Sequence, residues 1–352
     1  MSLQDELIAR IHSNGPISIA DYMAECLFHP TYGYYTTHEP FGTAGDFITA
    51  PEISQMFGEL IGLALAQAWI DQGSPTSFTL AELGPGRGTL MVDALRATAQ
   101  VPGFHDAAQI VLVEASARLQ EIQAHSLSGY NVSFTADAET LPDAPLYFVA
   151  NEFFDALPVR QFVRTRTQWR ERLVGLSDSG LSFGLGPEGR QPSLDHRLDD
   201  TQEGDIVETS PQMAPICATL TSRIARFGGI GLAIDYGDWR SLGDTLQAME
   251  KHSFADVLSS AGWADLTAHV DFETLAASAV CAHSRLTTQG MFLERLGITD
   301  RARALAHNLK GEALDRHIAA HRRLTHPEEM GNLFKALGFF PKGMAPPPGL
   351  DV

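Results

Sequence analysis

Apolar residues recur at helical spacing in the first part of the chain. This spacing predicts helices over residues 3–11, from Ser18 onward and over residues 51–72. Residues 29–49 are instead rich in glycine, proline and aromatic side chains, which predicts a long loop. Gly58 and Gly62 lie one turn apart in the third predicted helix, so we expect another element to pack closely against that face.

Short apolar runs alternate with helical segments after Gly73, which is the pattern of a parallel α/β sheet. The runs expected to be strands are 78–83, 110–114, 132–134, 146–150 and 231–235. Residues 161–186 interrupt this order, because polar and apolar residues alternate there around a turn at Asp178, and we expect an inserted antiparallel hairpin. Beyond Gly237 the chain is expected to be mostly helical, with a strongly periodic helix over residues 299–323.

A glycine-rich turn follows the first predicted strand and opens a helix. Its sequence is Glu82-Leu83-Gly84-Pro85-Gly86-Arg87-Gly88-Thr89. Glycines at this spacing let the backbone approach a ligand, and the helix N-terminus offers free N–H groups, so we expect a nucleotide-like ligand. The acidic Glu82 disfavours a pyrophosphate and favours a ligand that carries an ammonium or sulfonium charge. The candidate cofactor-binding residues are Glu82, Gly84, Pro85, Gly86 and Gly88. The alternative is a structural turn without a ligand.

Two acidic residues near the ends of the next strands are further candidates for cofactor contacts. Glu114 ends the second predicted strand, where a carboxylate can accept both hydroxyls of a ribose. Asp137 follows the third predicted strand and could meet an adenine amino group. Each residue has an alternative interpretation, Glu114 as a solvated strand end and Asp137 as a plain turn residue.

Polar residues also follow the fourth predicted strand. The sequence there is Asn151-Glu152-Phe153-Phe154-Asp155-Ala156-Leu157-Pro158. In a parallel α/β enzyme, this edge of the sheet is where the chemistry takes place. The carboxylates of Glu152 and Asp155 could hold a guanidinium and turn one of its nitrogens toward an electrophilic methyl group. Asn151, Glu152 and Asp155 are therefore the candidate catalytic residues, with Glu152 favoured. The alternative is that Asn151 and Asp155 cap turns and a helix.

Residues 43–54 combine a glycine, hydroxyl side chains and Asp46 ahead of the third predicted helix. They could form a lid over the ligand, and in that case Asp46 and Thr49 are candidate cofactor contacts. They could equally be a helix entry, capped by Thr49 with Pro51 in the first turn. The histidines, His269 among them, have no spacing typical of a metal site, so we expect no metal.

The composition narrows the classes of function. The chain has 352 residues, and 25 Lys and Arg against 43 Asp and Glu give a formal net charge of −18. This balance argues against nucleic-acid binding through a basic face, and it favours encounter with a basic protein segment. Cys26, Cys217 and Cys281 lack metal or disulfide spacing, and no apolar stretch reaches the roughly 20 residues of a membrane span. We expect a cytoplasmic protein without membrane insertion.

A series of motifs, in order along nearly the whole chain, resembles the MidA-like class I methyltransferases. The motifs are Tyr32-Gly33-Tyr34-Tyr35, the block from Gly45 to Ser54, Phe57-Gly58-Glu59, the block from Glu82 to Thr89, the block from Asn151 to Pro158, Asp235-Tyr236-Gly237, the block from Asp265 to Phe272, Thr288-Gln289-Gly290 and the block from Met330 to Lys335. The glycine turn alone fits many enzymes that use S-adenosyl-L-methionine (SAM), whereas the ordered set is specific to this family.

The resemblance implies a class I, Rossmann-like, seven-stranded SAM methyltransferase fold. By similarity to the mitochondrial members, it implies arginine methylation of a core subunit of respiratory complex I during assembly. It would put Gly84, Gly86 and Gly88 under the methionine and ribose of SAM, Glu114 on the ribose hydroxyls, and Asn151-Glu152 at the site of methyl transfer. The segment around residues 239–255 is shorter and less basic than the family pattern leads us to expect. We expect this difference to affect recognition of the substrate and not binding of the cofactor.

We expect a helical or lid region over residues 1–75 and a methyltransferase core over residues 76–352. The core would carry the hairpin at 160–187 and a helical substrate-side region at 270–330. Because these additions offer a docking surface, the expected partner is a protein substrate, and a homodimer is left open. The alternatives are an assembly chaperone that binds SAM without catalysis and a methyltransferase that acts on another protein or on a small molecule.

Overall fold

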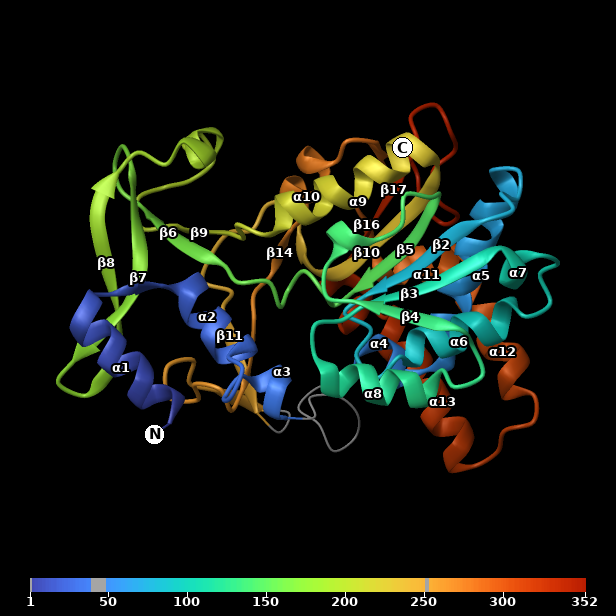
Figure 1. Cartoon of the computed structure of the whole chain (residues 1–352), viewed down its shortest axis with the longest axis horizontal. Coiled ribbons are helices and arrows are strands. Elements are labelled where there is room, and N and C mark those ends of the chain that lie inside the picture. The colour runs from blue at the N-terminus through green and yellow to red at the C-terminus, as the bar shows by residue number, and fades with distance from the viewer. Residues whose placement is uncertain (1, 39–48, 251–252) are drawn as a thin grey trace. The chain divides into compact units, whose positions relative to one another are not determined.

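The computed structural model describes residues 2–38, 49–250 and 253–352, which form two compact units. The first unit draws on residues 1–47, 155–213 and 240–271, and the second on residues 48–154, 214–239 and 272–352. The elements of both are labelled in Figure 1. The division between the units does not fall at residue 75, where we expected a boundary. The helix at 55–71 lies in the second unit, because it packs on the sheet of that unit.

A largely parallel sheet forms the centre of the second unit. Its strands are β2 (Phe78–Leu83), β3 (Ala108–Val113), β4 (Val132–Thr135), β5 (Leu146–Asn151), β10 (Gly229–Asp238), β15 (Ala282–His283), β16 (Thr287–Thr288) and β17 (Phe334–Phe340). They run in the order β15-β17-β10-β5-β2-β3-β4, and β16 also pairs with β17. The five predicted strands are all present and parallel to one another, whereas β17 is antiparallel to β10. The predicted α/β fold is confirmed.

The register of the parallel strands aligns their carboxyl ends. Leu83 lies opposite both Val113 and Ala150, and Asn151 lies opposite Ile234. The residues that follow β2, β3 and β5 therefore come out at one edge of the sheet, which is where a parallel α/β fold holds its ligand.

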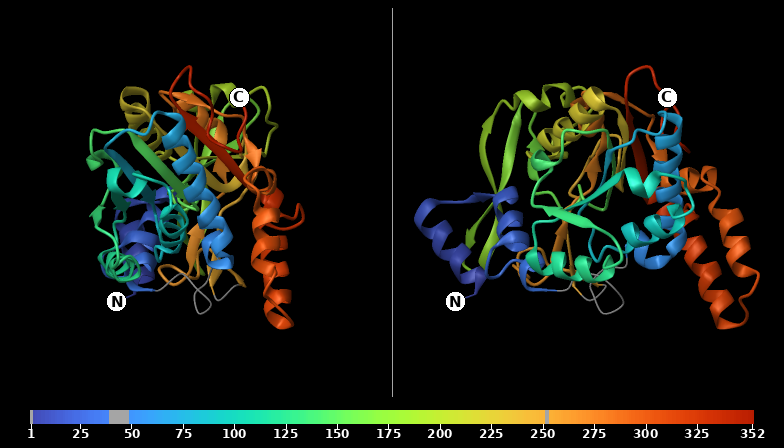
Figure 2. Two further views of the ribbon diagram at one scale, coloured as in Figure 1. Left: turned by 90° about the vertical axis from the view of Figure 1, so that its right-hand side faces the viewer. Right: turned by 45° about the vertical axis from the view of Figure 1, so that its right-hand side comes forward.

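Helices surround this sheet. They are α4 (Ala50–Ile53), α5 (Gln55–Asp71), α6 (Thr89–Thr98), α7 (Phe104–Ala107), α8 (Ala117–Ser126), η1 (Ala138–Thr140), α9 (Met213–Phe227), α10 (Phe272–Ser278), α11 (Gln289–Arg295), α12 (Ile298–Ala306), α13 (Glu312–Thr325) and α14 (Met330–Leu333). Figure 2 shows α12 and α13, in orange and red, as neighbouring helices beside the sheet.

Two predicted helices are each divided in the structure. The helix expected over 51–72 breaks at Ser54, which has the extended φ of −160° and accepts a hydrogen bond from the Met56 N–H as the N-cap of α5. The helix expected over 299–323 breaks before α13, where Gly311 has a φ of +56°. Apolar spacing alone did not reveal either break, since apolar residues continue on both sides of each one.

Close packing of α5 on α6 confirms the prediction from Gly58 and Gly62. A Cβ atom on Gly58 would lie 2.8 Å from the Asp93 Cβ, and one on Gly62 would lie 2.6 Å from the Ala94 Cα. Because these contacts are to backbone and Cβ atoms, a side chain could be fitted only by moving one helix away from the other.

We expect Gly62→Ala to lower the free energy of unfolding by about 1–3 kcal/mol, the usual cost of overpacking. At a site with free space, the same change inside a helix would stabilise by up to about 1 kcal/mol. Denaturant unfolding of Gly62→Ala measures the loss, and Gly129→Ala, in the turn after α8 and with nothing within 4 Å of the added Cβ, is the control. A Gly62→Ala protein as stable as the control would contradict the packing.

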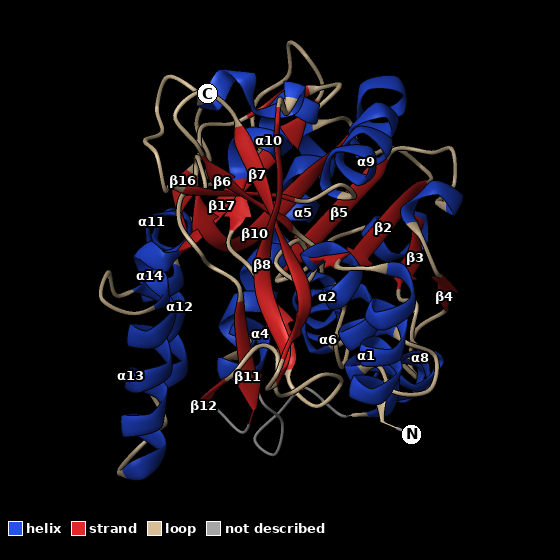
Figure 3. Ribbon diagram, turned by 90° about the vertical axis from the view of Figure 1, so that its left-hand side faces the viewer, coloured by secondary structure: helices blue, strands red, loops and turns tan. Residues whose placement is uncertain are grey.

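The first unit contains a five-stranded antiparallel sheet and a smaller three-stranded one. The strands of these two sheets are β1 (Ile17–Ser18), β6 (Arg160–Arg164), β7 (Trp169–Ser177), β8 (Gly180–Gly189), β9 (Ile206–Thr209), β11 (Gln247–Glu250), β12 (Ser253–Ala255) and β13 (Asp265–Thr267). The unit also contains the short strand β14 (Val270–Asp271), which belongs to neither sheet, and the helices α1 (Leu3–Asn14), α2 (Ile19–Phe28), α3 (Tyr34–Thr37) and η2 (Pro192–Arg197). The larger sheet has the order β1-β7-β6-β9 with β8 on β7, and the smaller has β12-β11-β13. Figure 3 shows the long β7–β8 pair, and α1 and α2 pack against β7.

The predicted hairpin is present, but it belongs to this larger sheet and does not stand alone. The expectation of a mostly helical chain beyond Gly237 is wrong for residues 247–271, where short strands form. These strands have only two to four residues each, too few for an alternating pattern to stand out. Among the described residues, no helix is both long enough and apolar enough to cross a membrane.

Candidate active site

The glycine turn joins β2 to α6 at the ligand edge of the sheet. Gly84, Gly86 and Gly88 have φ angles of +60°, +55° and +81°, which an L side chain adopts only with strain. The Gly84 N–H donates to the Val113 carbonyl over 3.0 Å, and the Gly88 N–H donates to the carbonyl of Pro85 over 2.7 Å. The turn is thus fixed by backbone bonds, and α6 begins directly after it at Thr89.

Glu82 is buried in β2, two residues before the turn. Burial raises the pKa of its carboxyl from the ordinary value of 4.5 to about 8, and a hydrogen bond from the Met91 backbone N–H opposes this rise. Its Oε2 atom has no hydrogen-bond partner among the described residues. A buried carboxyl in this state would be stabilised by a cationic ligand group close by, since an opposite charge favours the ionised form.

Glu114 lies at the end of β3 with its carboxylate held in place. Its Oε1 accepts a hydrogen bond from the Ser116 N–H over 2.8 Å, and its Oε2 accepts one from the Gln123 Nε2 over 3.1 Å. Burial raises the pKa of Glu114, and these two donors oppose the rise. The interpretation of Glu114 as a solvated strand end is wrong, because the residue is only 9% exposed.

The remaining cofactor candidates differ in what the structure shows. Pro85 is buried within the turn. Asp137 is exposed and caps the short helix η1, since its Oδ1 accepts from the Glu139 N–H over 2.7 Å. Asp46 lies outside the described residues. Thr49 precedes α4 as its N-cap residue but makes no side-chain capping bond.

Glu152 follows β5 and is the centre of the polar groups at this edge. Its Oε1 accepts hydrogen bonds from the Ala50 N–H and from the Asn151 Nδ2, each over 3.0 Å. The Oδ1 of the buried Asn151 has no hydrogen-bond partner among the described residues. A second bond joins α4 to the glycine turn, because the Thr89 hydroxyl donates to the Glu52 carboxylate. The start of α4 therefore contacts both the predicted catalytic loop and the helix after the turn.

The backbone of Glu152 adopts a φ of +51°, an uncommon value for a residue with a side chain. Residues held in strained backbone conformations cluster at functional sites. The Glu152 N–H donates to the Ile234 carbonyl over 2.9 Å, which holds this conformation in place.

The strain predicts an inverted stability order for two variants that both lack the carboxylate. We expect Glu152→Gly to be more stable than Glu152→Ala by about 1 kcal/mol, because only glycine relieves the left-handed conformation. At an ordinary position the glycine variant would be the less stable one. Thermal unfolding of the two proteins checks the order, and a more stable alanine variant would show that φ is not strained there.

Asp155 belongs to the first unit, whereas Asn151 and Glu152 belong to the second. Asp155 is buried, and its carbonyl accepts from the Ala268 N–H over 3.0 Å. Near it, the Tyr35 hydroxyl lies 3.0 Å from both carboxylate oxygens of the buried Asp265. Burial, followed by the charges of Asp265 and Asp155, raises the pKa of Tyr35 well above its ordinary value. The pairing of Asp155 with Glu152 stays a prediction.

Several residues of these networks were not singled out from the sequence. They are Glu52, Thr89, Gln123, Phe153 and, in the first unit, Tyr35 and Asp265. Phe153 packs on the turn, since a Cβ atom on Gly84 would lie 3.0 Å from its ring. Most of these residues lie inside the motifs that carry the family resemblance, and their place in those motifs could have identified them as site residues. Gln123 stands outside them.

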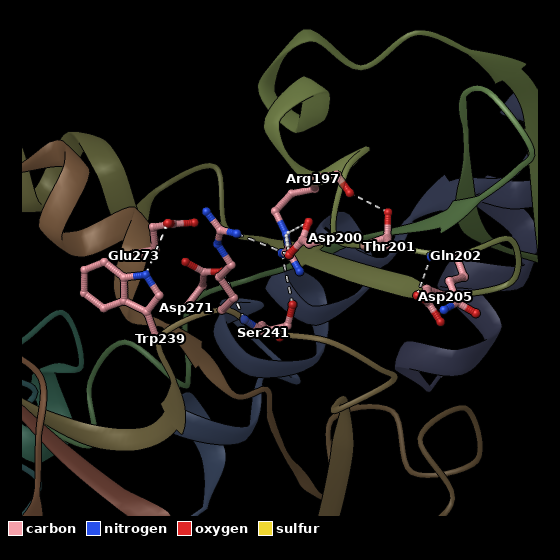
Figure 4. Close-up of polar contacts among 10 residues, drawn as sticks. Arg197, Asp200, Thr201, Gln202, Asp205, Trp239, Ser241, Asp271 and Glu273 are labelled. Atoms are coloured by element: carbon pink, nitrogen blue, oxygen red, sulfur yellow. Dashed lines mark hydrogen bonds and ion pairs between the residues drawn. The ribbon is translucent and has the colours of Figure 1, made fainter.

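The segment after Trp239 is anchored within the first unit (Figure 4). The Ser241 carbonyl accepts from the buried Arg197 over 3.1 Å, and the Ser241 N–H donates to Asp271 over 3.1 Å. Arg197 and Arg240 both contact the Asp200 carboxylate, at 3.0 and 3.4 Å. Residues 239–255, where we expected a departure from the family pattern, thus begin with a fixed attachment.

Comparison with known proteins decides the family. The model of a family described as "Putative S-adenosyl-L-methionine-dependent methyltransferase" matches residues 60–292. The chain belongs to this family. The family resemblance drawn from the ordered motifs is thereby confirmed.

Similar proteins extend over almost the whole chain. The Xenopus tropicalis "Protein arginine methyltransferase NDUFAF7, mitochondrial" is 36% identical over 97% of this chain and 86% of its own length. The Homo sapiens protein of the same name is 36% identical over 95% of this chain and 82% of its own. A Burkholderia thailandensis protein crystallised with S-adenosyl-homocysteine (SAH) is 28% identical, with a TM-score of 0.81 over 99% of this chain and 92% of that one.

As a member of this methyltransferase family, the chain is a SAM-dependent enzyme, and the predicted cofactor is confirmed. The residues at the ligand edge fit SAM. The glycine turn lets the backbone approach the cofactor closely. The Glu82 oxygen that has no partner among the described residues suits the cationic groups of SAM. The Glu114 carboxylate, which is held in place by its donors, suits the ribose hydroxyls.

Proposed function

We propose that this methyltransferase transfers a methyl group from SAM to the guanidinium of an arginine in a protein, and that the protein is a core subunit of respiratory complex I during assembly. The observation that carries the proposal is the Glu152 carboxylate, held by two donors beyond β5 at the edge where the glycine turn lies. The names of the relatives, protein arginine methyltransferases, support the same substrate class.

The cofactor would be held by residues on three neighbouring strands. Gly84, Gly86 and Gly88 would lie under its methionine and ribose, with Glu82 near the positive charge. Glu114 would accept hydrogen bonds from the ribose hydroxyls. Asp137, exposed after β4, is proposed to contact the adenine amino group in addition to capping η1.

Bound SAM supplies a methyl group on a positively charged sulfur. The protein then has to align the attacking nitrogen at about 3 Å and exclude water. Glu152 would accept N–H bonds from the guanidinium and so concentrate its charge away from the attacking nitrogen. In the transfer, an N–C bond would replace the S–C bond of the cofactor, and the Glu152 carboxylate would take up the proton that leaves the nitrogen. Asn151 and the Ala50 N–H would keep that carboxylate in position.

Complex I isolated from cells that carry either the native chain or Glu152→Gln would test this proposal in its biological setting. Peptide mass spectrometry is expected to find a methylated arginine in a core subunit only with the native chain. Normal assembly without any methylated arginine in both strains would instead favour a chaperone. We also propose that the protein works in a reducing cytoplasm, since its three cysteines are buried free thiols. The proposed oligomeric state is a homodimer.

A pH-dependent release of protons is expected when SAM binds. The pKa of Glu82 is raised to about 8, so at pH 7 the carboxyl is largely protonated without ligand, and a cationic ligand favours its ionisation. Affinity should therefore rise between pH 6 and about 8, and close to one proton should leave at pH 7. By the same linkage, the ligand-free protein loses stability as pH rises from 4.5 to about 8.

Calorimetric titration at pH 7 in two buffers of different ionisation enthalpy measures this proton release. Glu82→Gln, which cannot ionise, serves as the control and should release none. Equal proton release by both proteins would assign the effect to another group.

A further inference from the structure

Gln123 is a fully buried polar residue in α8, and it joins two parts of the proposed cofactor site. Its Nε2 donates to the carbonyl of Gly86 over 2.8 Å and to the Oε2 of Glu114 over 3.1 Å. The first partner belongs to the glycine turn after β2, and the second to the end of β3. One amide group thus fixes the spacing between them.

The orientation of the amide follows from its partners. Both are acceptors, so the NH₂ group must face them, and a reversed amide would place oxygen against oxygen. The Oε1 atom then points away and has no hydrogen-bond partner among the described residues. Leaving a buried oxygen unsatisfied is unfavourable, and an apolar side chain of this size would avoid that cost. Packing alone therefore does not account for glutamine at this position.

Gln123 lies on the buried face of α8, where the helix packs on the glycine turn. Leu119, one turn earlier on α8, is also buried on that face. The Gln123 side chain packs toward the turn, since a Cβ atom on Gly88 would lie 3.7 Å from its Cγ. The polar group is thus directed at the ligand edge of the sheet and not at solvent.

We propose that Gln123 is a positioning residue for SAM, which orients the Glu114 carboxylate toward the ribose while its bond to the Gly86 carbonyl fixes the direction of the amide. This inference rests on the role proposed above for Glu114. Gln123 itself does not touch the cofactor. Its donor also stabilises the ionised form of Glu114, the form that accepts hydrogen bonds from both ribose hydroxyls.

The test is calorimetric titration of the full chain with two probes, SAH and an SAH analogue that lacks the 2′ and 3′ hydroxyls. For Gln123→Leu we expect the Kd for SAH to rise about 10- to 100-fold, as for loss of a hydrogen bond to a charged group. The Kd for the analogue should stay within about twofold of the native value, since its binding does not use Glu114. Gln123→Met is the second variant, and Gln109→Leu, at an exposed position on β3, is the control.

A pH series adds a readout that a purely structural role would not change. Without its amide donor, Glu114 should take up a proton at higher pH, so SAH affinity in Gln123→Leu should begin to fall at higher pH than in the native protein. Unchanged SAH affinity, or equal weakening for both probes, would overturn the proposal. The variant Glu114→Gln distinguishes the role proposed for Glu114 from the positioning role of Gln123. If it binds SAH normally, the role of Glu114 itself is wrong, whereas if only Gln123→Leu binds normally, the positioning role alone is wrong.

Discussion

Glu152→Gln is expected to reduce methyl transfer on the order of 10³-fold, the loss typical of removing one preorganised electrostatic group. The amide keeps the size of the side chain but loses the charge that attracts the guanidinium and the site that accepts its proton. SAH affinity should change by less than about threefold, because we propose that the glycine turn and Glu114, and not Glu152, hold the cofactor.

Initial rates with radiolabelled SAM and SAH titration of the same preparations give both quantities. Glu121→Gln, at an exposed position on α8, makes the same chemical change away from the site and should leave both values unaltered. A Glu152→Gln enzyme with more than about a tenth of native activity would mean that another group holds the substrate.

Gly86→Val is expected to weaken SAM binding by at least about 100-fold. A β-branched side chain is strained at the φ of +55° found there, and it would project from the turn where the backbone must approach the ligand. The carbonyl of Gly86 also accepts from Gln123, so a shift of this peptide would disturb a second part of the site.

Calorimetric titration measures the loss, and circular dichroism checks that the variant is folded. Gly129→Val is the matched control, because a side chain at Gly129 would meet nothing within 4 Å and its φ is ordinary for an L residue. Native SAM affinity in a folded Gly86→Val protein would show that the turn does not approach the cofactor.

The sequence predicted the parts of the structure that local patterns control. Apolar runs gave the parallel strands, and the glycine spacing located the turn between β2 and α6. Gly58 and Gly62 predicted close helix packing, since only glycine accommodates a backbone within 3 Å of the missing Cβ. The alignment of Glu114 and Glu152 at one edge followed from the parallel direction of their strands.

Other features depend on contacts between distant segments and could not be predicted locally. The boundary between the two compact units, which the chain crosses between Glu152 and Asp155, has no local sequence signal. Gln123 looked like an ordinary polar residue of a helix until α8 was placed against the glycine turn. The strained φ of Glu152 has no sequence signal either, because that residue type rarely adopts it.

The most direct test of the central claim is identification of the methylated amino acid. Purified enzyme, radiolabelled SAM and each recombinant, unmodified core subunit of complex I are incubated together, and the labelled subunit is hydrolysed and its amino acids separated. We expect label in methylarginine of one core subunit with the native enzyme, and almost none with Glu152→Gln. Label in another amino acid, or no label in any core subunit from an enzyme that binds SAM normally, would contradict it.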